Sequence, residues 1–121
     1  MKNILLVEDD SFLIDIYTKQ LTVAGFNVTV ASDGQMAINK IKELSPDLVM
    51  LDIILPKISG WEVLRIVREE LNLKDLKIIV LSALSQKEDL EKGSIYNIVK
   101  YLTKTENTPS QITEEVKKIL N

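Results

Sequence analysis

The sequence predicts a single α/β domain over residues 1–121, built around a parallel sheet with helices on both faces. Short apolar runs alternate along the chain with longer segments of helical period, which is the pattern of βαβ units. The run at residues 4–7 is apolar at every position, as expected for a strand that helices cover on both sides. Including this one, five short runs rich in apolar and β-branched residues predict strands at residues 4–7, 27–31, 47–51, 77–81 and 98–102.

Residues that start and stop helices lie between these runs. Apolar residues at helical spacing follow the first run until Gly25, where the first helix is expected to end. Further helices are predicted at residues 33–44, 60–71, 86–95 and 109–120. Each of these four begins with the spacing of a capping box, a Ser or Thr followed three residues later by Glu or Gln. The pairs are Ser32 and Gln35, Ser59 and Glu62, Ser85 and Glu88, and Thr108 and Gln111.

The (βα)5 order of these elements predicts a doubly wound parallel sheet. Right-handed crossovers place helices on both faces of such a sheet, and the expected strand order is the flavodoxin-like order 2-1-3-4-5. The run at residues 27–31 alternates Val28 and Val30 with polar residues, so it is expected at an edge of the sheet. Ligands in such sheets bind beyond the carboxyl ends of the strands, which is therefore where chemistry is expected.

Composition excludes several classes of chemistry. The 121 residues contain no His and no Cys, which removes Ser-His and Cys-His catalysis, imidazole and thiolate metal ligands, and disulfides. Lys and Arg number 15 against 18 Asp and Glu, a net charge of −3, so no basic surface argues for nucleic acid. The apolar run near the N-terminus is too short for a signal peptide or a membrane span. A cytoplasmic domain without membrane contact is expected.

Acidic residues gather where the first and third predicted strands end. Glu8, Asp9 and Asp10 follow the first strand, and Asp52 follows the third. The ordinary explanation of the triplet is that carboxylates favour the start of a following helix. Asp52 closes an apolar run beside that triplet, and such a cluster requires a cation or raised pKa values. Because oxygen ligands suit a hard cation, Mg²⁺ is the implied metal.

Two further polar residues follow the last two predicted strands. Ser82 ends the fourth, and Lys104 lies two residues past the fifth. Each by itself is typical of an ordinary strand-end or surface residue. Together with the acidic cluster they bring a carboxylate nucleophile, an ammonium group and a hydroxyl to one edge, which are the groups that an incoming phosphoryl group requires.

Five motifs occur in the order found in one protein family. They are VEDD at residues 7–10, D-x-x-x-P at 52–56, Ser-Gly at 59–60, Ser-Ala at 82–83 and Y-L-x-K at 101–104. With these motifs at the predicted strand ends, essentially the whole chain resembles the receiver domain of two-component response regulators. The resemblance implies a phosphorelay signalling switch, a regulatory domain rather than an enzyme.

The resemblance implies a role for each acidic residue. Asp52 is implied as the phosphoacceptor, taking a phosphoryl group from a phosphohistidine on a partner histidine kinase or phosphotransfer protein. Asp9 and Asp52 are implied as Mg²⁺ ligands, together with Glu8 through water and the backbone carbonyl of Ile54. Asp10 is expected to serve the start of the first helix, with an accessory place at the site.

The resemblance also implies how the signal leaves the site. Lys104 is implied to pair with the phosphoryl oxygens, and Ser82 to hydrogen-bond them after transfer. Tyr101 falls at the aromatic position that reports the state of the site. The change is thus expected to pass through Ser82 and Tyr101 to the face formed by the fourth helix, the fifth strand and the fifth helix. An output domain or a target protein is the implied partner, with no direct contact to nucleic acid.

Two loops depart from the family pattern. Thr105 follows Lys104 where the family usually has Pro, often in a cis peptide. A cis bond without Pro costs about 2.5–4 kcal/mol, so a trans peptide and a differently shaped loop are expected. Asn97 and Ile98 stand where the family commonly has Gly-Ala, and Asn tolerates the left-handed backbone that this turn requires.

The residue two positions after Asp52 bears on the lifetime of the phosphoryl group and on the class of protein. Ile54 occupies this position, and Leu84 lies two positions after Ser82. Both side chains are bulky and apolar, and neither can orient a water. Slow self-catalysed dephosphorylation is therefore expected. A phosphatase of the haloacid dehalogenase type would need a second Asp at position 54 as general acid, so Ile54 disfavours that class of enzyme.

Two further hypotheses differ in how well the sequence supports them. A flavin or nucleotide binding module on this fold would need a Gly- or Ser/Thr-rich phosphate loop after the first strand, where this chain is acidic. A degenerate receiver that acts as a phosphorylation-independent interaction module is the stronger competitor of the switch. The presence of Asp9, Asp52, Ser82 and Lys104 argues against it.

Overall fold

The computed structural model describes residues 1–83, 91 and 93–121, and within them five parallel strands form a sheet in the order β2-β1-β3-β4-β5. This confirms the predicted α/β class and the strand order 2-1-3-4-5. As predicted, β2 lies at an edge of the sheet. The strands are β1 (Asn3–Val7), β2 (Asn27–Ala31), β3 (Leu48–Asp52), β4 (Lys77–Ser82) and β5 (Lys100–Thr103).

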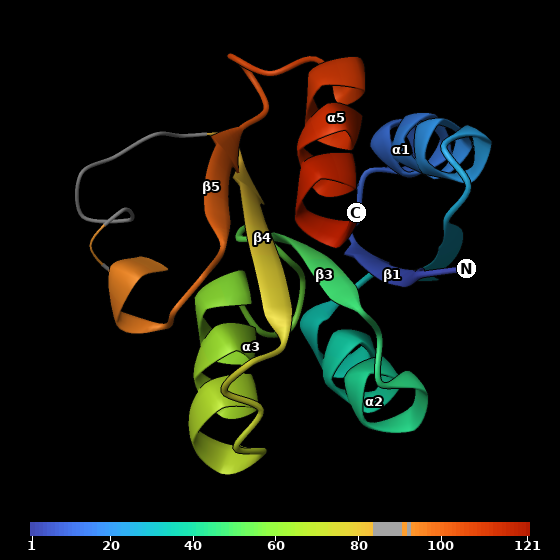
Figure 1. The fold of residues 1–121 in the computed structure, drawn as a ribbon. Helices are drawn as coiled ribbons and strands as arrows, with labels where there is room; N and C mark the ends of the chain where they lie inside the picture. The colour runs from blue at the N-terminus through green and yellow to red at the C-terminus, as the bar shows by residue number, and fades with distance from the viewer. Residues whose placement is uncertain (84–90, 92) are drawn as a thin grey trace.

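Helices cover both faces of the sheet (Figure 1). One face carries α1 (Ser11–Val23) and α5 (Pro109–Leu120), and the other carries α2 (Gly34–Leu44) and α3 (Gly60–Arg65). α3 continues directly into a π-helical segment, η1 (Ile66–Glu70). The predicted helix at residues 86–95 and its expected cap, Ser85 with Glu88, lie largely outside the described residues, of which 91 and 93–95 are helical. Among the described helices, none has the length and apolar character needed to cross a bilayer.

Alternate residues of the strands belong to two separate hydrophobic cores. In β1, Leu5 and Val7 belong to the core shared with α2 and α3, whereas Ile4 and Leu6 belong to the core shared with α1 and α5. All four side chains are at most 1% exposed. Burial on both faces is the reason why this segment is apolar at every position.

Two of the predicted helix caps form. At α5, the backbone N–H of Gln111 donates to Thr108 Oγ1 at 3.1 Å, and the backbone N–H of Thr108 donates to Gln111 Oε1 at 2.8 Å, so the capping box is complete. At α3, Ser59 Oγ accepts from the backbone N–H of Glu62. The Glu62 carboxylate binds Arg65 instead of closing a box.

The predicted cap at Ser32 is wrong, because α2 begins one residue later. Asp33 is the N-cap, and its Oδ1 accepts from the backbone N–H of Met36 at 2.8 Å. This bond is the main reason why the pKa of Asp33 is lowered, and Lys57 Nζ, 3.4 Å from Asp33 Oδ2, adds to the effect. An ionised acceptor satisfies the positive start of a helix better than the neighbouring hydroxyl does.

The third and fifth strands lie slightly later in the chain than predicted. β3 includes Asp52, and β5 begins at Lys100 instead of residue 98. Before β5, Asn97 adopts a left-handed φ of 55°, as its residue type predicts. The peptide between Lys104 and Thr105 is trans, as expected without Pro.

Arg68 on η1 ties the chain segments that lead into β4 and β5 to the end of α3. Its side chain is buried, with 4% of the residue exposed. The guanidinium donates hydrogen bonds to four backbone carbonyls, those of Leu73, Leu76, Tyr96 and Asn97. Since a guanidinium offers five N–H donors in a fixed plane, one side chain satisfies both segments.

We predict that Arg68→Met lowers the free energy of unfolding by about 3 kcal/mol, because several buried carbonyls then lack a donor. Arg65→Met is the matched control one turn earlier: its guanidinium pairs with Glu62 at the surface, and its loss should matter much less. Urea unfolding of the three proteins measures the difference. Equal losses in both variants would contradict the role given to Arg68.

Candidate functional site

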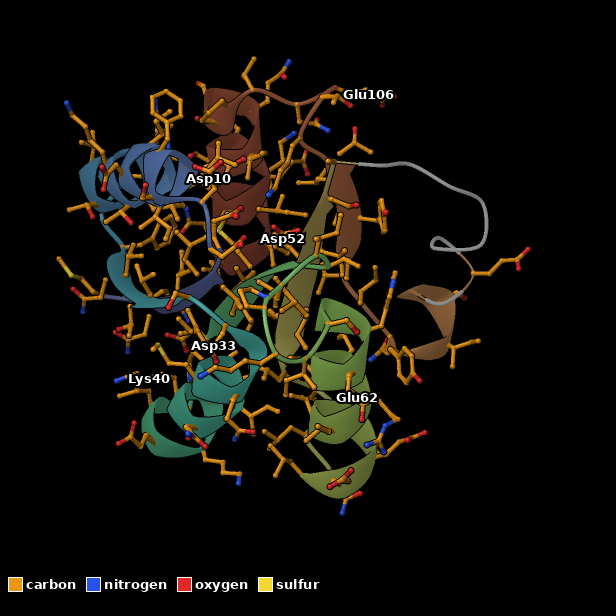
Figure 2. All side chains as sticks on the ribbon, turned by 180° about the vertical axis from the view of Figure 1, so that it is seen from behind. Asp10, Asp33, Lys40, Asp52, Glu62 and Glu106 are labelled. Atoms are coloured by element: carbon orange, nitrogen blue, oxygen red, sulfur yellow. The ribbon has the colours of Figure 1, made fainter. Side chains whose placement is uncertain are left out.

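The carboxyl ends of four strands place the predicted site residues at one edge of the sheet. Glu8 and Asp9 follow β1 directly, and Asp52 is the last residue of β3. Ser82 is the last residue of β4, and Lys104 comes directly after β5. Figure 2 shows Asp52 at this edge, at the end of its strand. The parallel sheet thus brings together residues that lie far apart in the sequence.

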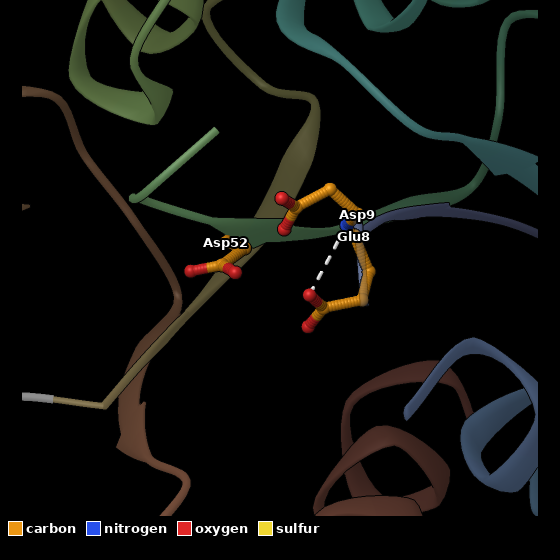
Figure 3. A group of neighbouring side chains, drawn as sticks. All are labelled: Glu8, Asp9 and Asp52. Carbon is orange, nitrogen blue, oxygen red and sulfur yellow. Dashed lines mark hydrogen bonds between the residues drawn. The ribbon is translucent and has the colours of Figure 1, made fainter. Parts of the chain in front are cut away.

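Glu8, Asp9 and Asp52 form a carboxylate cluster (Figure 3), as the sequence predicts. One carboxylate oxygen of each residue lies within 4.8 Å of the other two. Glu8 is 1% exposed and Asp52 is 5% exposed, whereas Asp9 is exposed to solvent. Three carboxylates with no imidazole or thiolate among them are a donor set that fits a hard divalent cation such as Mg²⁺.

Lys104 joins the two buried carboxylates. Its Nζ lies 2.6 Å from Glu8 Oε1 and 2.9 Å from Asp52 Oδ2. The trans peptide after Lys104 therefore does not prevent the side chain from reaching the site. Burial disfavours the charged ammonium, but the hydrogen bonds to Glu8 and Asp52 outweigh it, so the pKa of Lys104 is raised. Lys104 is a cation throughout the physiological range.

The second oxygen of each buried carboxylate accepts from the backbone. Glu8 Oε2 accepts from the N–H groups of Asp9 at 3.1 Å and Asp10 at 3.2 Å, and Asp52 Oδ1 accepts from the N–H of Ile54 at 3.2 Å. Burial nevertheless raises the pKa of Glu8, and the charge of Asp52 adds to the rise, while the hydrogen bond from Lys104 opposes it. The folded protein thus disfavours the ionised form of Glu8.

Asp10 and Ile54 flank the cluster in different ways. Asp10 is the N-cap of α1, with Oδ1 accepting from the backbone N–H groups of Phe12 at 2.9 Å and Leu13 at 3.2 Å. This confirms the expectation that Asp10 serves the first helix. The side chain of Ile54 is 62% exposed, so an apolar group stands at the open side of the loop after Asp52.

Gly60 allows α3 to begin directly against the strand that carries Asp52. The backbone N–H of Gly60 donates to the carbonyl of Ile53 at 2.8 Å. A Cβ at position 60 would overlap the carbonyl oxygen of Asp52 and would lie 2.7 Å from Ile53 Cα. Only a residue without a Cβ permits this approach, which explains the Ser-Gly motif in physical terms.

Ser82 and Tyr101 lie on neighbouring strands, as predicted. Ser82 is buried at the end of β4, and its carbonyl accepts from the backbone N–H of Lys104 at 2.8 Å. Ser82 pairs in register with Thr103, and Tyr101 lies two residues before Thr103 in β5. Tyr101 is half-buried against the core under α3. Leu84, the second residue expected to influence the lifetime of the phosphoryl group, lies outside the described residues.

Two residues near the site were not identified from the sequence. Tyr17 on α1 is 2% exposed; burial raises its pKa, and the charges of Lys104 and Glu8 also act on it. Asn107 hydrogen-bonds the carbonyl of Thr103 next to Lys104. In the sequence, Tyr17 falls at ordinary helical core spacing, and Asn107 falls in a polar loop, so neither carries a signal that spacing alone could reveal.

A known family matches this arrangement. The family profile described as "Response regulator receiver domain" matches residues 4–117. The chain is a response regulator receiver domain. A solved receiver domain protein of the CheY-like type from Methanospirillum hungatei has the same fold as this receiver domain, with a TM-score of 0.90 and 26% identity over 99% of this chain and 94% of that one. The BeF3-activated DrrB receiver domain superposes with a TM-score of 0.84 and 29% identity, covering 99% of this chain and 97% of that one.

Longer regulators are related to this receiver domain. It is 36% identical over 104 residues to the DNA-binding dual master transcriptional regulator RpaA of Synechocystis sp.. The aligned region covers 86% of this chain and 43% of that protein. It is also 33% identical over 119 residues to the alkaline phosphatase synthesis transcriptional regulatory protein PhoP of Bacillus subtilis. Here the aligned region covers 98% of this chain and 48% of that protein. The receiver domain therefore spans less than half the length of either regulator.

The raised pKa of Glu8 predicts a pH-dependent stability in metal-free buffer. A carboxyl group whose pKa is raised in the folded state favours folding most at pH values below its ordinary value of 4.5, and that contribution is lost as the pH rises through the folded-state pKa. Glu8→Gln should therefore melt a few degrees above the parent at pH 7, and the difference should vanish near pH 4. Thermal unfolding in the presence of a chelator measures both. The control is Glu106→Gln, which changes an exposed carboxylate and should leave the melting temperature close to that of the parent. A parent that melts at a higher temperature than Glu8→Gln at pH 7 contradicts the prediction.

Proposed function

We propose that this receiver domain is a phosphorylation-dependent switch in which Asp52 accepts a phosphoryl group from a phosphohistidine on a partner histidine kinase or phosphotransfer protein. The observation that carries the proposal is the bond between Asp52 Oδ2 and Lys104 Nζ at 2.9 Å, inside a carboxylate cluster. An Asp52 oxygen attacks phosphorus, the bond from phosphorus to the partner's imidazole nitrogen breaks, and the imidazole leaves. The receiver acts as the acceptor of this transfer and not as an enzyme with a separate substrate.

The acidic cluster supports a Mg²⁺ requirement for the transfer. The carboxylates of Asp9 and Asp52, the backbone carbonyl of Ile54 and, through water, Glu8 would hold the ion. When bound, Mg²⁺ supplies positive charge that offsets the charges of the carboxylates and of the phosphoryl group. Asp9 is exposed, so it is the carboxylate through which an ion from solvent reaches the two buried ones.

Lys104 and Ser82 provide hydrogen-bond donors for the transferred group. The ammonium of Lys104 already lies against Asp52, so it meets phosphoryl oxygens that are attached there without a large displacement. A phosphoryl group adds about −1.5 to −2 charges and three acceptor oxygens, and the buried hydroxyl of Ser82 is an uncharged donor at the end of the adjacent strand.

A shift of Ser82 toward the phosphoryl group couples the site to Tyr101. Space beside β4 opens, Tyr101 rotates toward it, and the face formed by the fourth helix, β5 and α5 changes shape. That face then presents the signal to an output domain or a target protein. The related regulator RpaA is named as DNA-binding, and this receiver covers 43% of it, so we assign the receiver to signal input and not to nucleic acid.

The apolar side chain at position 54 supports a long-lived acyl phosphate. Ile54 is 62% exposed beside Asp52 and offers no group that could orient an attacking water or accept its proton. The same residue disfavours a phosphatase, which needs a general acid there. A phosphorylation-independent interaction module is the second candidate, and labelling of Asp52 distinguishes it from the switch.

We expect acetyl phosphate to add one phosphoryl group to the parent when Mg²⁺ is present and none when a chelator is present. Asp52→Asn should accept none, because an amide oxygen is a poor nucleophile and forms no stable acyl phosphate. Intact mass measures the addition. Asp9→Asn is the companion variant and should require more Mg²⁺ for the same labelling. Full labelling of Asp52→Asn would show that another residue is the acceptor.

Ser82→Ala should leave the labelling of Asp52 largely intact but uncouple it from Tyr101. The measurement is the change in backbone amide chemical shifts over residues 93–121 on adding beryllofluoride, which mimics the phosphoryl group. Shifts in Ser82→Ala should shrink to a small part of those in the parent, because the hydroxyl that moves is gone. Ser82→Thr keeps the hydroxyl and should retain them. If beryllofluoride shifts the amides of Ser82→Ala as much as those of the parent, the Ser82 hydroxyl does not couple Asp52 to Tyr101.

A further inference from the structure

The loop between β5 and α5 begins with Lys104, and its backbone sets where the ammonium group stands. Lys104 Nζ contacts two buried carboxylates, at 2.6 Å and 2.9 Å, so a small displacement of its backbone would break one contact or the other. The next two residues, Thr105 and Glu106, are exposed. Neither is Pro, so no ring restricts the backbone there, and hydrogen bonds must determine the shape of the loop.

The first hydrogen bond holds Lys104 from the β4 side. Its backbone N–H donates to the carbonyl of Ser82 at 2.8 Å, which extends the pairing of β4 and β5 by one step beyond the last strand residue. This bond determines the position of the backbone nitrogen of Lys104. It leaves open the direction in which the chain continues from Lys104.

Asn107 closes the loop on the other side of Lys104. Its backbone N–H donates to the carbonyl of Thr103 at 3.1 Å, and its side-chain Nδ2 donates to the same carbonyl at 3.0 Å. Both bonds return to the residue directly before Lys104, so residues 104–106 form a closed turn. Figure 2 shows Glu106 at the outer end of this turn, away from Asp52.

The side-chain bond depends on the residue type at this position. Any residue except Pro could supply the backbone N–H, but the carboxamide adds a second donor to the Thr103 carbonyl. Asn107 is half-buried, and the next residue, Thr108, starts the capping box of α5. Asn107 is therefore held between a fixed strand end and a fixed helix start, which leaves its side chain little freedom.

We propose that Asn107 is a positioning residue for Lys104: by closing the turn on the Thr103 carbonyl, its carboxamide holds the lysine backbone where the ammonium group reaches Asp52. Asn107 touches neither the carboxylates nor the phosphoryl group and acts through Lys104. The consequence for phosphoryl transfer rests on the function proposed above. The consequence for the geometry of the loop does not.

The test uses Asn107→Ala, with Glu106→Ala as the matched control in the same turn. Loss of one hydrogen bond to the turn should speed amide hydrogen exchange at Lys104 about 2- to 10-fold in metal-free Asn107→Ala and leave it unchanged in the control. The initial rate of phosphorylation by acetyl phosphate with Mg²⁺ should fall by a similar factor. Melting temperatures of both variants should stay within a few degrees of the parent.

A Lys104→Met background separates positioning from a general structural effect. If Asn107 acts through Lys104, adding Asn107→Ala to Lys104→Met should not slow phosphorylation further, because the group that Asn107 positions is already absent. An equal slowing in both backgrounds overturns the proposal, as does an Asn107→Ala protein labelled at the parent rate. If the parent itself is not phosphorylated, the proposed function fails, and the hydrogen exchange of Lys104 still decides: faster exchange supports the turn, and unchanged exchange overturns it.

Discussion

A single ammonium group holds two buried carboxylates together at one edge of the sheet, and the rest of the site depends on this contact. Glu8 and Asp52 are 1% and 5% exposed, and an unpaired charge at either position would cost several kcal/mol. Lys104 Nζ reaches both, at 2.6 Å and 2.9 Å. The three residues come from the ends of β1, β3 and β5, so the bridge forms only if these strands end at the same level of the sheet.

The fold supports this bridge at a distance from the charges. Two apolar cores, one on each face, hold the strands in parallel register, and the register determines which residues follow the strand ends. Gly60 lets α3 start against the backbone of Asp52, and Arg68 ties the segments before β4 and β5 to the end of the same helix. Asn107 closes the loop that carries Lys104. The site is thus a property of the sheet edge as a whole.

Under the proposed function, the same bridge makes the domain responsive. Glu8 and Asp52 share one cation, and a phosphoryl group on Asp52 would bring further negative charge to that cation. The contacts of Lys104 would then be redistributed, and the buried hydroxyl of Ser82 would become a second donor. A switch of this kind requires two arrangements that differ by only a few kcal/mol, and the sharing of one cation by two carboxylates offers a route between them. Asp9 is exposed at the cluster, where an ion can enter and leave.

Local patterns in the sequence determined the helices and strands and the polar residues that follow the strand ends. The tertiary structure decided which contacts hold those residues in place. The apolar segment of β1, the edge position of β2, the cap at Thr108 and the left-handed Asn97 all follow from nearby residues, so the sequence predicts them. The cap at Ser32 was predicted wrongly because Asp33 competes one residue away and also contacts Lys57 from another loop. The two carboxylate partners of Lys104 lie 96 and 52 residues away, and no local pattern encodes such pairings. The four carbonyls of Arg68 and the turn at Asn107 were also beyond the sequence, because a hydrogen bond to a backbone carbonyl leaves no mark on the identity of the residue that accepts it.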